Sequence, residues 1–120
     1  MTTTFYGLKT CDTCRKARKA LDAAGVDYAY VDVRADGVSS ADLKRWASAA
    51  GWEKLVNKNS TTWRGLDDGA KADLDEARAL ALLAAHPTLI KRPVIEVAGA
   101  GGSAVYVGWT PETRGALGIA

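Results

Sequence analysis

The sequence contains few of the residues that build metal centres and disulfide frameworks. Its 120 residues include two cysteines, Cys11 and Cys14, and one histidine, His86. A structural zinc site needs four ligands, so this chain would have to complete one with carboxylates, and we expect no metal. A stapled framework of several disulfides is excluded by the cysteine count. The fold must therefore depend on a hydrophobic core, for which 48% apolar residues suffice.

Long hydrophobic runs and an excess of one charge sign are also lacking. No apolar run approaches the roughly 20 residues of a membrane-spanning helix. Residues 1–4 lack the basic and apolar regions of a secretory signal, so we expect a cytoplasmic protein without a membrane partner. The net charge is +2, with acids and bases interspersed, which gives no electrostatic argument for nucleic-acid binding.

The two cysteines form one motif, Cys11-Asp12-Thr13-Cys14, between a predicted strand at 3–7 and a predicted helix at 13–24. A cysteine at the start of a helix meets unpaired backbone N–H groups and the positive end of the helix dipole, which favour a thiolate. Cys14 shares the same helical face, so it can attack a mixed disulfide formed on Cys11. This placement favours a redox-active pair over zinc or a structural disulfide.

Apolar periodicity predicts the other elements and their buried faces. The predicted order is a strand, a helix and a strand, then a helical insertion at about 38–86, then two strands and a helix. This order is that of a thioredoxin-like α/β fold with a mixed four-stranded sheet, in a single domain of residues 1–120. The expected elements after the first helix are a strand at 28–33, helices ending at Gly51 and Ala85, a loop at 52–66, strands at 94–97 and 104–107, and a helix from Thr110-Pro111.

The three predicted helices that carry most of the packing have apolar positions at helical spacing. The positions expected to be buried are Cys14, Ala17, Leu21 and Ala24 in the first, Leu43, Trp46, Ala47 and Ala50 in the second, and Ala77, Leu80, Ala81 and Ala84 in the third. We expect a break in the third helical stretch near Asp73.

Pro93 comes directly before the third predicted strand. Thioredoxin-like folds commonly place a cis proline here, facing the cysteine pair, so that the neighbouring backbone can pair with a bound thiol substrate. We therefore expect a cis bond before Pro93. The alternative is a trans proline as the first residue of a strand, which a sheet also tolerates.

Several segments together resemble one family. They are Tyr6–Ala17, Gly51–Trp52, Thr61–Arg64, Ile90–Val94 and Val107–Trp109. On these motifs the chain resembles the ArsC/Spx family of arsenate reductases and redox regulators, and most closely its YffB-like branch. The resemblance covers nearly the whole length.

Resemblance to the arsenate reductases implies a nucleophilic thiolate surrounded by three arginines that bind the oxyanion, with glutathione and glutaredoxin completing the cycle. The thiolate matches Cys11 and one arginine matches Arg92, beside Pro93. Asn57 and Gly108 stand where the other two arginines are expected. Because each bidentate arginine gives an oxyanion strong charge-assisted hydrogen bonds, we expect genuine arsenate reduction to be negligible.

Six other residues are candidates for contact with a small thiol or an anionic substrate. These are Thr10, Thr13, Lys58, Arg64, Lys91 and Pro93. The cations would partly replace the missing arginines, although lysine offers a point charge rather than a planar fork. Arg64 has an alternative role as a surface arginine packed on Trp63 or Trp52. Thr10 and Thr13 either cap the first helix or donate to the thiolate.

Two functions follow from the resemblance. The first is a thiol-dependent oxidoreductase, coupled to glutathione or to thioredoxin or glutaredoxin, in which Cys11 attacks, Cys14 resolves and Arg92 stabilises the thiolate. The alternative is an Spx-type redox-sensing transcriptional regulator that binds the RNA polymerase α subunit. Gly51 matches the glycine that Spx-type proteins present to that subunit, whereas the bulky Trp52 beside it argues against the regulator.

Overall fold

The computed structural model describes residues 2–72, 74–99 and 102–119. The chain divides into two compact units, one formed by Met1–Asp36 with Arg92–Ala120 and the other by Gly37–Lys91. Within the described residues no helix has the length and apolar character needed to cross a membrane.

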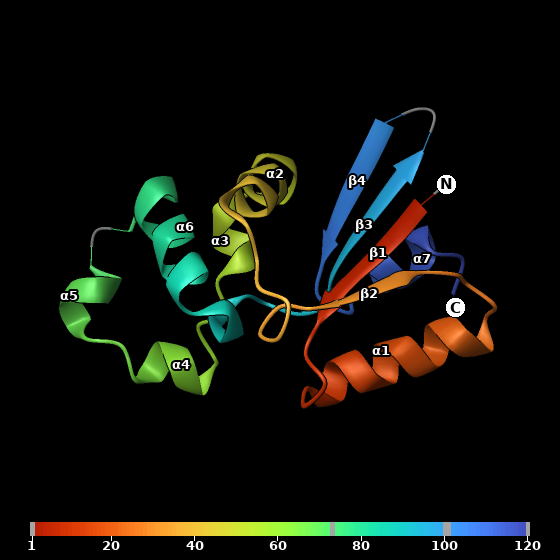
Figure 1. The fold of residues 1–120 in the computed structure, drawn as a ribbon, viewed down its shortest axis with the longest axis horizontal. Helices are drawn as coiled ribbons and strands as arrows, with labels where there is room; N and C mark the ends of the chain where they lie inside the picture. Colours follow the sequence, from red (N-terminus) through yellow and green to blue (C-terminus); the bar gives the residue numbers. More distant parts are fainter. Residues whose placement is uncertain (1, 73, 100–101, 120) are drawn as a thin grey trace. The chain divides into compact units, whose positions relative to one another are not determined.

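The first unit is built on a four-stranded sheet. Its strands are β1 (Thr2–Gly7), β2 (Ala29–Asp32), β3 (Val94–Gly99) and β4 (Gly102–Val107), in the order β2-β1-β3-β4. β1 pairs parallel with β2 and antiparallel with β3, and β3 pairs antiparallel with β4 (Figure 1). The prediction of a mixed four-stranded sheet in a thioredoxin-like α/β fold is confirmed. β3 and β4 reach further into their hairpin than predicted, and the residues between them, 100 and 101, lie outside the described residues.

One face of this sheet is covered by α1 (Asp12–Ala23). The buried cluster contains Phe5 and Ile95 from the sheet with Cys14, Ala17 and Leu21 from the helix, as the helical spacing predicts. Burying each large side chain stabilises the fold by about 1.5–3 kcal/mol. The expected burial of Ala24 is wrong, because this residue is the C-cap of α1 and is exposed.

The chain ends with α7 (Pro111–Ala116). Thr110 caps this helix with its hydroxyl, which accepts a hydrogen bond from the N–H of Thr113 at 3.2 Å. Pro111 occupies the first turn, where no backbone N–H is needed, so the predicted helix start is confirmed. Leu117 and Ile119 pack against the same buried cluster as α1, so the C-terminal segment completes the core of the first unit.

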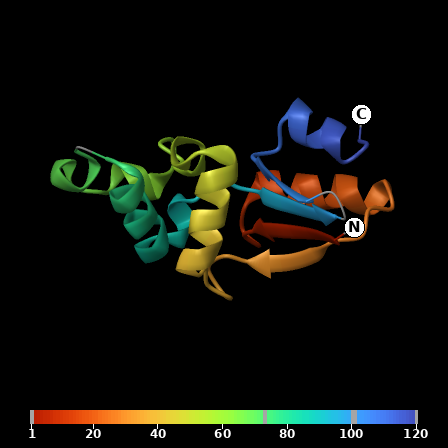
Figure 2. The ribbon, with the colours of Figure 1, turned by 90° about the horizontal axis from the view of Figure 1, so that it is seen from above.

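The second unit is helical. It contains α2 (Ser40–Ala50), α3 (Trp52–Leu55), α4 (Thr61–Arg64), α5 (Asp68–Lys71), α6 (Glu76–Ala85) and a 3₁₀ turn at Pro87–Leu89. Figure 2 shows α2 and α6 side by side, and these two helices share contacts with α3. Its fully or nearly fully buried side chains are Leu43, Trp46, Ala47, Leu55, Val56, Ala79, Leu83, Leu89 and Ile90.

Two expectations for the second unit are wrong. Residues 52–66 are not an irregular loop, because they contain α3 and α4; the hydroxyl of Ser60 caps α4 by accepting from the N–H of Trp63 at 3.1 Å. The buried face of α6 is formed by Ala79 and Leu83. The three alanines predicted to be buried are exposed, namely Ala77, Ala81 and Ala84. Alanine and leucine surround most of this helix, so apolar periodicity could not choose its buried side. The expected break at residue 73 lies outside the described residues.

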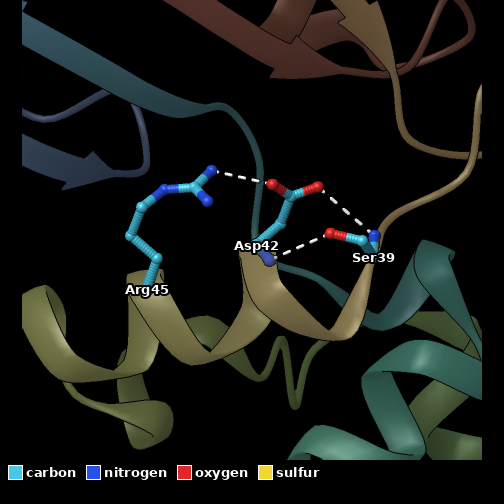
Figure 3. Close-up of polar contacts among 3 residues, drawn as sticks. All are labelled: Ser39, Asp42 and Arg45. Carbon is cyan, nitrogen blue, oxygen red and sulfur yellow. Dashed lines mark hydrogen bonds and ion pairs between the residues drawn. The ribbon is translucent and has the colours of Figure 1, made fainter.

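The start of α2 is fixed by a reciprocal capping box (Figure 3). The hydroxyl of Ser39 accepts from the N–H of Asp42 at 3.1 Å, and the Asp42 carboxylate accepts from the N–H of Ser39 at 3.3 Å. Arg45, one turn later, donates to the same carboxylate at 2.8 Å. These hydrogen bonds lower the pKa of Asp42 although its partial burial opposes the shift. At the other end, Gly51 closes α2 at a φ of 91°, which favours glycine.

Candidate active site

Cys11 lies between the end of β1 and α1, where it is the N-cap residue of the helix. Its Sγ accepts a hydrogen bond from the backbone N–H of Cys14 at 3.4 Å. Its own N–H donates to the carbonyl of Leu8 at 3.2 Å, which closes the turn that presents the sulfur. The thiol is free and half-buried, so the sulfur is held by the backbone but is not sealed in the core.

The electrostatics of Cys11 favour the thiolate. Burial alone would raise the pKa of Cys11, but it is outweighed by hydrogen bonds from the Cys14 thiol and backbone N–H and by the hydrogen bond and charge of Arg92. The pKa of Cys11 is therefore lowered. The sequence predicts this direction from the helix dipole, whereas the structure attributes it to specific donors, Cys14 in α1 and Arg92 just before β3.

Cys14 has the opposite environment. It is fully buried in the cluster with Phe5 and Ala17. Burial, the hydrogen bond to Cys11 and the charge of Cys11 together raise the pKa of Cys14 to about 12, against the opposing effects of the backbone N–H of Leu8 and the charge of Arg92. One thiol of the pair is thus prepared as a nucleophile, and the other holds its proton.

Arg92 and Pro93 lie directly before β3, in the same unit as the cysteines. The peptide bond between them is cis, as expected from the position before the third strand. The side chain of Arg92 supplies both a hydrogen bond and a positive charge to Cys11. β3 pairs with β1, so sheet formation brings residues 92 and 93, far apart from the cysteines in sequence, to the end of the strand that precedes Cys11.

Thr10 and Thr13 flank Cys11, and both are exposed. The expectation that one of them caps α1 is wrong, because the Cys11 sulfur itself accepts the capping hydrogen bond from Cys14. Their alternative role, donation to the thiolate or to a bound thiol, stays a prediction.

Lys58, Arg64 and Lys91 belong to the second unit. The ammonium group of Lys58 lies 5.7 Å from the centroid of the Trp63 ring, and that of Lys71 lies 5.6 Å from it. Arg64 is exposed at the end of α4, and Lys91 is exposed while its backbone N–H donates to the carbonyl of Leu55 at 2.7 Å. Their role in binding an anionic substrate stays a prediction.

Asp32 is a polar residue of this region that the sequence patterns did not single out. It is only 6% exposed, and its carboxylate accepts from the backbone N–H groups of Lys9, at 3.2 Å, and of Arg34 and Ala35, both at 2.9 Å. Burial would raise the pKa of Asp32, but these N–H groups lower it. Asp32 therefore ties the segment before Cys11 to the turn after β2. Its position opposite Gly7, at the carboxyl end of a parallel strand, is the signal that could have identified it.

The described ranges hold no group of three or more histidine, cysteine, aspartate or glutamate side chains placed to bind one metal ion. The chemistry of the arrangement comes from its two sulfurs, of which Cys11 is accessible and Cys14 is adjacent. A sheet with this strand order, a helix that begins at a Cys-x-x-Cys motif and a cis proline before the third strand define a thioredoxin-like protein.

The family model described as "ArsC family" matches residues 6–117, so the chain belongs to the ArsC family. A curated relative from Haemophilus influenzae, described as an uncharacterized protein, is 48% identical over 92 residues, which cover 77% of this chain and 81% of the relative. YusI of Bacillus subtilis, also described as uncharacterized, is 33% identical over 97 residues, or 78% of this chain and 82% of YusI.

Solved structures agree with this assignment. A structure named YffB protein is 42% identical, with a TM-score of 0.87, over 97% of this chain and 98% of that one, which confirms the expected YffB-like branch. A structure described as an arsenate reductase related protein from Brucella melitensis is 37% identical, with a TM-score of 0.73, over 97% and 93% of the two chains. An arsenate reductase from Vibrio cholerae, 22% identical with a TM-score of 0.77 over 98% of each chain, shares the fold.

Proposed function

We propose that this protein is a thiol–disulfide oxidoreductase in which Cys11 is the nucleophile and Cys14 the resolving thiol. The observation that carries the proposal is that the two adjacent thiols have pKa values shifted in opposite directions. The pKa of the accessible Cys11 is lowered, and that of the buried Cys14 is raised to about 12. A thiolate is needed for the first attack, and a second thiol nearby is needed to release the product.

The reaction has two exchange steps. The Cys11 thiolate attacks one sulfur of a disulfide RS–SR, the S–S bond breaks, and one RS⁻ leaves while Cys11–S–SR forms. Cys14 then loses its proton and attacks the Cys11 sulfur, which releases the second RS⁻ and forms the Cys11–Cys14 disulfide. The substrate has gained two electrons and the protein has lost them. Two equivalents of glutathione, or one dithiol of thioredoxin or glutaredoxin, restore the reduced pair.

A small anionic thiol suits the surface next to Cys11. A groove of about 380 Å³ is lined by Leu8, Lys9, Thr10, Asp32, Arg34 and Ala35. Glutathione carries two carboxylates, and the groove offers the exposed Lys9 and Arg34 as the opposite charges. This complementarity supports glutathione as the donor. Lys9→Ala and Arg34→Ala should raise the KM for glutathione with little change in kcat, while Lys19→Ala, on exposed α1 surface, should change neither.

Reduction of arsenate is not part of the proposal. Arg92 lies beside the thiolate, but Asn57 and Gly108 stand at the two other positions where the arsenate reductases carry arginine. Each lost charge-assisted pair removes about 1.5–3 kcal/mol of oxyanion binding, so two losses weaken it by several orders of magnitude. Turnover of arsenate at micromolar concentration would contradict this reasoning.

The deciding experiment is reduction of hydroxyethyl disulfide with glutathione, glutathione reductase and NADPH. Wild-type protein should show turnover and Cys11→Ser none. Lys19→Ala, on the exposed surface of α1, is the control and should behave as wild type. In a separate experiment, Cys14→Ser treated with glutathione disulfide and then freed of small molecules should carry one glutathione per chain as a mixed disulfide, visible by intact mass. Absence of wild-type turnover with both glutathione and thioredoxin as donors would refute the proposal.

The regulator alternative depends on the match at Gly51. This glycine has a structural cause, since it ends α2 at a φ of 91°, and a side chain there would be strained. The alternative is favoured instead if the protein shows no disulfide turnover and binds purified RNA polymerase α subunit in a manner that oxidation of Cys11 and Cys14 changes.

A further inference from the structure

The hydroxyl of Tyr30 is a buried polar group without a hydrogen-bond partner among the described residues. The ring itself is well packed, 6.0 Å between centroids from Phe5 and 3.9 Å from the guanidinium carbon of Arg18. Burial of an unsatisfied hydroxyl costs free energy that phenylalanine would avoid. Packing of the ring alone therefore does not explain why this residue is tyrosine.

Sheet register places Tyr30 beside Phe5 in the layer that α1 covers. Tyr30 pairs with Phe5, and Phe5 is buried against α1 with Cys14. Tyr30 packs against that same cluster. Burial raises the pKa of Tyr30, and the charges of Asp32, Cys14 and Asp36 raise it too. The charge of Arg18 acts in the opposite direction. The phenol therefore keeps its proton and can donate a hydrogen bond.

Cys14 needs such a donor at one stage of the cycle. In the resting state Cys14 keeps its proton, because its pKa is raised, and so carries no charge. Once Cys11 is bound in a mixed disulfide, Cys14 must ionise in a fully buried site. Its thiolate is favoured by the backbone N–H of Leu8 and the charge of Arg92. A buried thiolate is usually stabilised by several donors.

We propose that the Tyr30 hydroxyl donates a hydrogen bond to the Cys14 thiolate while Cys14 resolves the mixed disulfide. This inference rests on the proposed function. The phenol keeps its proton throughout. The proton of Cys14 passes to the departing RS⁻, the Cys14 electron pair forms the bond to the Cys11 sulfur, and the S–SR bond breaks. Tyr30 thus assists the second exchange step and has no part in the first.

The test separates the two steps without any physiological partner. Reduced protein is mixed in a stopped-flow instrument with an aromatic disulfide that releases a coloured thiolate at each exchange. The first phase reports attack by Cys11, and the second reports resolution by Cys14. Tyr30→Phe should leave the first phase unchanged and slow the second about tenfold, as a rise of roughly one in the pKa of the attacking thiol would do. The thermal unfolding midpoint should not fall, since an unpartnered hydroxyl is removed.

Tyr28→Phe is the matched control. The Tyr28 hydroxyl donates to Asp22 at 3.2 Å and accepts from Arg18 at 3.3 Å, so it has partners of its own. Its removal should leave both phases unchanged. The inference is overturned if Tyr30→Phe leaves the second phase as fast as wild type, or slows both phases equally. Either result can occur with glutathione-dependent turnover intact, so it differs from failure of the proposed function, in which wild-type protein shows no turnover.

Discussion

A Cβ atom on Gly7 would lie 3.0 Å from the Sγ of Cys14, because β1 and α1 approach each other closely at this point. The same atom would lie 2.7 Å from the Cε1 of Phe5. Gly7 is therefore the residue that lets the resolving cysteine sit directly against the sheet, and it links packing of the core to the chemistry of the pair.

Gly7→Ala should destabilise the protein by roughly 1–3 kcal/mol, because the added methyl group overpacks a site whose neighbours are buried. Displacement of Cys14 should also slow the resolving step. Denaturant unfolding and single-turnover disulfide exchange measure the two effects. Gly115→Ala is the control: nothing lies within 4 Å of its Cβ, and it lies inside α7, so alanine should raise stability by about 0.5–1 kcal/mol. Equal effects of the two substitutions would contradict the packing argument.

Arg92→Gln should shift the reactivity of Cys11 to higher pH. The hydrogen bond and charge of Arg92 lower the pKa of Cys11, so their loss moves the ionisation toward that of an ordinary thiol. Since the thiolate is the reacting form, the alkylation rate rises with pH through the pKa. At a pH below both pKa values the thiolate fraction, and with it the rate, should fall about tenfold for each pH unit by which the pKa rises.

The measurement is the rate of iodoacetamide alkylation against pH, made in the Cys14→Ser background so that one thiol reacts. Lys19→Gln removes an equal charge from exposed α1 surface and should leave the profile in place. An unchanged profile in Arg92→Gln would show that the backbone N–H of residue 14 alone sets the pKa of Cys11.

Asp32→Ala should lower the free energy of unfolding by roughly 2–3 kcal/mol, because the backbone N–H groups of Lys9, Arg34 and Ala35 lose a charged acceptor. The pKa of Asp32 is depressed in the folded state, so its contribution is present above the ordinary aspartate value near 3.9 and is lost as pH falls toward the folded value. The free energy of unfolding, measured with denaturant from neutral pH down to about pH 3, should therefore fall less steeply with pH in Asp32→Asn than in wild-type protein. Asp22→Asn, an exposed residue, is the control.

Ser39→Ala should destabilise the helical unit by about 1 kcal/mol through loss of the N-cap of α2. Arg45→Ala should cost less, since its ion pair with Asp42 is solvent-exposed. Hydrogen exchange of the first turn of α2 measures the local effect. If Ser39→Ala left exchange unchanged while Arg45→Ala increased it, the ion pair and not the capping box would fix the start of this helix.

The elements near the redox motif were predictable because local signals agree there. Turn residues, helix caps and apolar spacing at Gly7, Cys11, Leu21 and Gly25 predict the first strand and helix within one or two residues of their observed ends. In α6 the same reasoning chose the wrong face, since a helix rich in alanine carries little directional information and its partners on α2 and in the 3₁₀ turn decide which side is buried.

By itself the sequence determined that a Cys-x-x-Cys motif stands at the start of a helix after a strand, and that no second cluster of ligands competes for those sulfurs. Only the tertiary structure decided that Asp32 holds the segment before Cys11, and that Tyr30, whose hydroxyl is buried, packs against the cluster containing Cys14. The physical reason is that thiol ionisation depends on burial and on donors brought together by strand pairing, and β3 carries Arg92 to Cys11 from 81 positions away in the chain, 92 minus 11.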